Sequence, residues 1–176
     1  MYLPAHLRCA SLPLLLIACT DKGNDSGSEL CPVSGDPELT IGYGVGDQFT
    51  AYEDGAEVSL ESAPQGGWGV GVRARTTGIG STDGDTPHAT SAVLLDTYLN
   101  GELAGSFLNE TVEVYCQDDG TGLIWGVVVG FDPETYDTNE DLLALNGEPV
   151  ELLVQATDGQ GRVATGTVDV IITVGR

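Results

Sequence analysis

The feature that most constrains the fold is an alternation of apolar side chains at every second position, repeated in short runs from about Leu39 onward. In residues 68–75 the apolar residues alternate with glycine and arginine. Because successive side chains of a strand point to opposite faces, this pattern predicts strands with one face in a core and the other in solvent. Residues 150–156 and 168–174 repeat it around a turn at 158–161, which predicts a hairpin.

Turn residues separate the other apolar runs at fairly even spacing. Asp54-Gly55 predicts a hairpin between runs at 49–52 and 57–60, and Asn100-Gly101 predicts a turn into a strand at 102–108. A separate strand is expected at 111–116. About ten short strands with one short helix predict an all-β fold, an antiparallel β-sandwich of 8–10 strands.

The single helix is expected within residues 133–145, where Asp137 or Thr138 can cap its first turn. The same stretch contains part of a calcium-loop pattern, and the residues at its positions 1, 3, 5 and 12 are Asp137, Asn139, Asp141 and Glu148. The sixth position should be glycine and is Leu142, so the capped helix is the preferred interpretation. No cofactor is expected, with calcium as the alternative.

Four further aspartates, in two turns, are weaker calcium candidates: Asp83, Asp85, Asp118 and Asp119. Aspartate is common in turns for backbone reasons, so these residues would hold calcium only if the two turns met at one end of the fold.

The N-terminus has the features of an export signal. Arg8 precedes an apolar run at 10–18 that is shorter than the roughly 20 residues a membrane-spanning helix needs. The run ends in Leu16-Ile17-Ala18-Cys19, which resembles the lipobox of bacterial lipoproteins. The resemblance implies cleavage before Cys19, a diacylglycerol thioether on its sulfur and a further acyl chain, such as palmitate, on its nitrogen. The alternative is an ordinary secretory signal with an incidental cysteine.

These features predict a cleaved signal at 1–18, an acylated N-terminus and flexible tether at 19–30, and a β domain at 31–176. The predicted location is the cell envelope, with attachment to the membrane through the lipid. By analogy with Gram-negative sorting, Thr20 after the cysteine favours the outer membrane, although Asp21 keeps the inner membrane open.

Charge and cysteine content limit the partners. The chain has 27 Asp and Glu against 6 Lys and Arg, a net charge of -21, so we expect no nucleic-acid partner. Once Cys9 is removed with the signal and Cys19 is acylated, Cys31 and Cys116 remain, and in an oxidising compartment they predict a disulfide. A free buried thiol is the alternative.

The last hairpin carries a second resemblance. Val154, Ala156, Asp158 and Gly161 form a V-x-A-x-D-x-x-G pattern that resembles the final hairpin of immunoglobulin-like extracellular modules. The strand tryptophan and paired cysteines of antibody domains do not align, because Cys31 precedes the first strand. The resemblance therefore implies an immunoglobulin-like architecture rather than membership of the antibody family.

A third resemblance lies at 64–68. Pro-Gln-Gly-Gly-Trp is similar to a turn and strand in uncharacterised envelope lipoproteins of myxobacteria, where a histidine often follows the aromatic residue. Here Gly69 occupies that position, and the resemblance implies no activity. A sharp turn leading into a core tryptophan explains the same residues without a function.

Catalytic patterns are not evident. A serine hydrolase would need His88, the only histidine of the mature chain, and no G-x-S-x-G elbow surrounds any serine. The sequence therefore favours a non-catalytic binding or structural module that contacts a protein or glycan partner. A calcium-stabilised adhesion domain is the alternative, and a small hydrolase is the least supported.

Overall fold

A computed structural model describes residues 35–63, 66–80 and 89–175 of the chain. Within these ranges the chain forms strands and one short helix, α1 (Asn139–Ala144). The strands are β1 (Glu38–Tyr43), β2 (Thr50–Ala51), β3 (Ala56–Ser59), β4 (Glu61–Ser62), β5 (Trp68–Thr77), β6 (Ala89–Leu99), β7 (Glu102–Cys116), β8 (Gly122–Gly130), β9 (Pro149–Asp158) and β10 (Val163–Thr173). The prediction of an all-β fold is confirmed.

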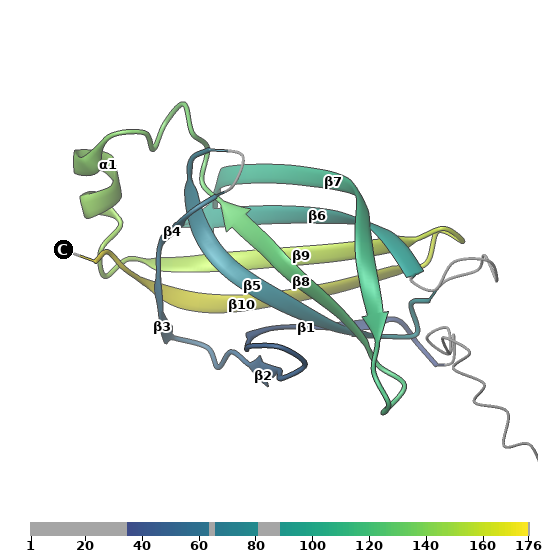
Figure 1. Ribbon diagram of the computed structural model, residues 1–176. Coiled ribbons are helices and arrows are strands. Elements are labelled where there is room, and N and C mark those ends of the chain that lie inside the picture. Colours follow the sequence, from purple (N-terminus) through teal and green to yellow (C-terminus); the bar gives the residue numbers. More distant parts are fainter. Residues whose placement is uncertain (1–34, 64–65, 81–88, 176) are drawn as a thin grey trace, which may run out of the picture.

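The strands form one continuous curled sheet with the order β2-β1-β5-β8-β7-β6-β9-β10-β3, and β4 is added to β5. Neighbouring strands are antiparallel, except that β3 runs parallel to β10. The sheet curls back on itself, so that β1 packs against β10 and β8 against β6 and β9 (Figure 1). Buried side chains from both halves of the sheet meet in one core.

The core follows the alternation of the sequence. Val150, Leu152, Val154 and Ala156 of β9 are all buried, and the residues between them are more exposed. Burying each such side chain contributes about 1.5–3 kcal/mol relative to exposure. Trp68 was expected in the core, but 37% of it is exposed, because it begins β5 beside the short edge strand β4.

The hairpin predicted around Asp54-Gly55 is wrong. The turn itself forms, since the Ala56 nitrogen donates to the Glu53 oxygen at 3.0 Å. However, β2 before it pairs with β1, whereas β3 after it pairs with β10. The turn carries the chain from one half of the sheet to the other, because β10 offers β3 a full strand edge that the two-residue β2 cannot match.

The strands predicted at 102–108 and 111–116 form a single strand, β7, which joins the two halves of the sheet. Most of β7 pairs with β6, but only Tyr115 and Cys116 pair with β8. Within the stretch that pairs with β6, Ser106, Phe107 and Leu108 are exposed in succession, so side chains on both faces of the strand reach the surface there.

Helix α1 connects β8 to β9 at one end of the sheet (Figure 1). Thr138 caps it: its hydroxyl accepts from the Asp141 nitrogen, and the Asp141 carboxylate accepts from the Thr138 nitrogen at 3.3 Å. This capping box was one of the predicted alternatives. Leu142 and Leu145 are buried at 5% and 2% exposure and hold this segment to the core.

Candidate functional site

Several predicted sites lie outside the described residues: Cys19 and the lipobox, Cys31, Asp83, Asp85 and His88. Cys116 is half-buried at the end of β7, next to Gly122 of β8. The Cys31–Cys116 disulfide and the acylation of Cys19 therefore stay predictions.

Two of the calcium candidates that the structure describes, Asp141 and Asp119, make local hydrogen bonds. The Asp141 carboxylate belongs to the α1 cap, and the Asp119 carboxylate accepts from the Thr121 hydroxyl at 2.7 Å and the Thr121 nitrogen at 3.0 Å. These Thr121 bonds lower the pKa of Asp119. Within the described ranges, no three His, Cys, Asp or Glu side chains gather as metal ligands would, so Asp137, Asn139, Asp141 and Glu148 do not form a cage there.

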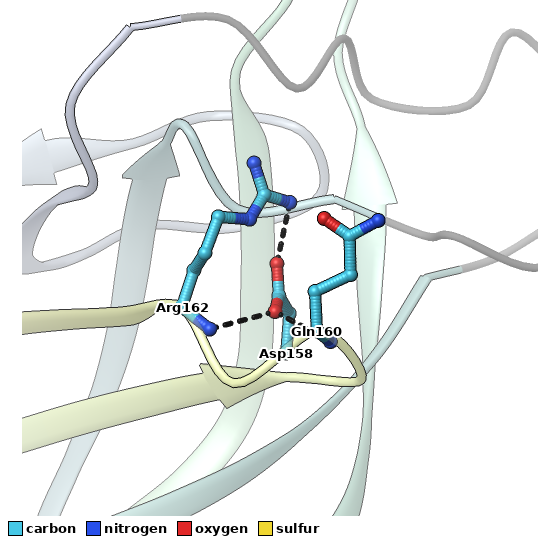
Figure 2. Close-up of polar contacts among 3 residues, drawn as sticks. All are labelled: Asp158, Gln160 and Arg162. Atoms are coloured by element: carbon cyan, nitrogen blue, oxygen red, sulfur yellow. Dashed lines mark hydrogen bonds and ion pairs between the residues drawn. The ribbon is translucent and has the colours of Figure 1, made fainter.

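The Asp158 carboxylate organises the turn between β9 and β10 (Figure 2). One of its oxygens accepts from the backbone nitrogens of Gln160 and Arg162, at 2.9 and 3.0 Å, and the other from the Arg162 guanidinium at 2.5 Å. Burial raises the pKa of Asp158, but the bonds from Arg162 and Gln160 outweigh it and hold the pKa below its ordinary value. All three bonds come from residues of the same turn, so the role of this carboxylate in the hairpin is structural.

The main concave feature of the described surface is a cleft between β7 and β8, with a volume of about 560 Å³. Its floor includes Leu95 of β6, Val127 of β8 and Phe131, which are otherwise part of the core. Phe107 and Asn109 of β7 form one wall. We call this feature the β7–β8 cleft.

Both ends of the β7–β8 cleft are closed by contacts between its walls. At one end the Asp132 nitrogen donates to the Ala104 oxygen at 2.8 Å, and Gly105 lies so close to Gly130 that a Cβ on Gly105 would lie 2.1 Å from the Gly130 oxygen. At the other end Tyr115 and Cys116 pair with β8. The walls are thus held together at both ends and open between them.

Exposed apolar side chains surround the cleft. Phe107 (39% exposed) and Leu103 (58%) line it, whereas Leu108 (55%) lies on the opposite face of β7. On β8, the partly exposed Trp125 stacks on Tyr115 with ring centroids 4.2 Å apart. Large apolar side chains that gather at an opening mark an interaction site more often than scattered ones do.

The charged side chains of β7 are acidic, as is Asp132, the charged residue among those described that line the cleft. Neither β7 nor β8 contains Lys or Arg, whereas β7 carries Glu102, Glu110 and Glu113. Asp132 lines the cleft, and the Thr135 hydroxyl and the Glu134 nitrogen donate to its carboxylate, which lowers the pKa of Asp132. The β7 strand and Asp132 are therefore negatively charged at neutral pH.

A second, smaller hollow of about 330 Å³ lies beside Tyr43, Tyr52 and Glu61. The two tyrosine rings are 5.1 Å apart, and burial, followed by the Glu61 charge, raises the pKa of Tyr52. Its smaller volume makes it a weaker candidate than the β7–β8 cleft.

Comparison of the chain with models of known protein families and with curated proteins finds no match. In the part of the chain that the structure describes, no helix has the length and apolar character needed to cross a membrane. The cleft was not predicted from the sequence. The available signal was the adjacent pair Phe107-Leu108, which breaks the alternation and puts apolar side chains on both faces of one strand.

Proposed function

We propose that this protein is a lipid-anchored cell-envelope protein whose β domain is a non-catalytic binding module, and that the ligand occupies the β7–β8 cleft. The observation that carries the binding role is an opening into the core between two strands, edged by exposed Phe107 and Leu103. Ligand sites are typically concave and combine apolar side chains with polar groups, as this cleft does.

The anchor rests on the lipobox-like sequence that ends in Cys19. In this proposal the signal is cut before Cys19, more than one acyl chain gives stable attachment where one would be marginal, and residues 19–30 tether the domain. The outer membrane is favoured over the inner. A Cys31–Cys116 disulfide would fix the start of the domain to β7, the strand that borders the cleft.

We also propose that the curled sheet is an immunoglobulin-like sandwich. Such domains pair strands A, B, E and D in one sheet and C, F and G in the other. The order β1-β5-β8-β7 on one side and β7-β6-β9-β10-β3 on the other supports this assignment, with β7 serving both sheets. The parallel pairing of the early β3 with the final β10 is a further point in its favour.

Parallel arrays of peptides and glycans test the binding role. The protein is compared with Phe107→Asp, which puts a charge on the cleft wall, and with Leu143→Asp, a control at a 57% exposed leucine on α1. The proposal expects at least one ligand class that the Phe107 variant loses and the Leu143 variant keeps. Binding equal in all three proteins, or no binding to either array, would contradict a ligand site in this cleft.

A further inference from the structure

We propose that the β7–β8 cleft binds an extended cationic peptide, which adds as a strand to the free edge of β7. This inference rests on the proposed function and names the class of ligand. It would explain both the opening of the sheet at this point and the acidic character of its walls.

The first argument is the backbone of β7. Among the described residues, no strand pairs with β7 between Gly105 and Val114 on the side away from β6. On the facing wall, β5 is the only strand in the described part of the chain that pairs with β8 between Ile124 and Val129. Unpaired strand edges of this kind hold backbone donors and acceptors ready for another strand, which is the basis of peptide recognition by strand addition.

The second argument is the side chains on the two faces of β7. Phe107 is opposite Leu95, so both lie on the face toward the cleft, whereas Leu108 is opposite Leu94 on the other face. A peptide strand beside β7 would direct alternate side chains into the cleft, against Leu95, Phe107 and Val127. The cleft therefore suits a peptide with an apolar residue at every second position.

The third argument is charge. The net charge of -21, the glutamates of β7 and the Asp132 carboxylate favour Lys or Arg at the outward positions of the peptide. The same charge opposes a second copy of this chain, because two such surfaces repel each other. Residues 20–30 of this chain are also a poor fit, since they carry acidic residues and almost nothing apolar.

A fluorescent nonapeptide of alternating Lys and Val tests the inference against the purified mature protein, by anisotropy. Three peptide controls test the charge, the alternation and the backbone pairing of the ligand in turn. They are a version with Glu in place of Lys, a version with all Lys before all Val, and a version with N-methyl groups on alternate backbone nitrogens. N-methylation removes about two net hydrogen bonds of roughly 1 kcal/mol each, so we expect it to weaken binding about tenfold or more. We expect the Glu and block versions to bind no more tightly than the N-methylated one.

The matching protein variants are Phe107→Ser and Leu103→Ser in the cleft and Leu143→Ser on α1, which remove an apolar side chain without adding a charge that would itself attract a cationic peptide. All three sites are at least 39% exposed, and retained melting temperatures check that the variants fold. Loss of one apolar contact predicts about tenfold weaker binding for the cleft variants, and a change within about twofold for the control. Added salt should weaken binding as well.

Equal binding of the N-methylated peptide would overturn strand addition, and equal binding of the Glu peptide would overturn the cationic ligand. Binding that neither cleft variant reduces would overturn the location. If no peptide binds but a glycan binds in a Phe107-dependent way, this inference fails and the proposed function stands. If nothing depends on Phe107, both fail.

Discussion

The Asp158→Asn substitution is a strict test of how the β9–β10 hairpin is held. The Asp158 side chain is fully buried, and its carboxylate accepts three hydrogen bonds, two from backbone nitrogens and one from Arg162. Asparagine can keep the two backbone bonds through its oxygen, but it presents an NH2 group to the guanidinium. The change therefore removes the charge-assisted bond and leaves Arg162 without its anion.

A hydrogen bond to a charged group contributes about 1.5–3 kcal/mol, and breaking a buried ion pair costs about 3–5 kcal/mol. The Arg162 side chain is 24% exposed, so water partly compensates its lost partner and the lower range applies. We expect Asp158→Asn to lower the free energy of unfolding by about 2 kcal/mol and Asp158→Ala, which also frees two backbone donors, by about 3–4 kcal/mol. Asp169→Asn, at an exposed position of β10, should change it by less than about 0.5 kcal/mol.

Urea unfolding at several pH values measures these differences. Because the folded pKa of Asp158 lies below its unfolded value, its stabilisation is complete above the unfolded pKa, near 3.9, and is lost as the pH falls through the folded pKa. The difference in the free energy of unfolding between the wild type and Asp158→Asn should therefore become smaller as the pH falls. A gap under about 0.5 kcal/mol at pH 7, or one that widens in acid, would refute the reasoning.

Three further outcomes are expected. Gly105→Ala should destabilise the protein by about 1–3 kcal/mol or more in urea unfolding, because the new Cβ would clash with the Gly130 oxygen. Gly130→Ala should be tolerated better, because its Cβ would lie 3.7 Å from the nearest atom, the Trp68 oxygen. Cys31→Ser and Cys116→Ser should each lower the free energy of unfolding by up to about 4 kcal/mol under oxidising conditions. An unchanged unfolding midpoint would argue against the disulfide. Millimolar calcium and a chelator should give the same melting temperature, because the described calcium candidates do not converge; a rise with calcium would favour the adhesion-domain alternative.

Local patterns predicted the local structure well. The alternation at 150–156 and 168–174 predicted the β9–β10 hairpin, whose register runs without interruption from Pro149–Ile171 to Thr157–Val163. The turn at Asn100-Gly101 also formed, with positive φ at both residues, as a tight hairpin turn requires. Short turns and two-residue periodicity depend on neighbouring residues, so the sequence alone specifies them.

The pairing of strands that are far apart in the sequence was harder to predict. Asp54-Gly55 makes a turn but not a hairpin, because turn chemistry reverses the chain without choosing the partner strands. The β7–β8 cleft depends on two strands that meet at both ends and separate between them, which no local pattern encodes. The adjacent pair Phe107-Leu108 was the one sequence feature that indicated the cleft, and adjacent apolar residues on a strand are too common to identify a site alone.

Mass spectrometry of the native protein from a membrane fraction tests the central claim, that this domain is displayed on a lipid anchor, most directly. The expected result is a mature chain that begins at Cys19 and carries the mass of a diacylglycerol thioether and an N-terminal acyl chain. In the Cys19→Ala variant, both lipid masses should be absent. A chain that keeps Met1, or one cut elsewhere with no acyl mass, would contradict it.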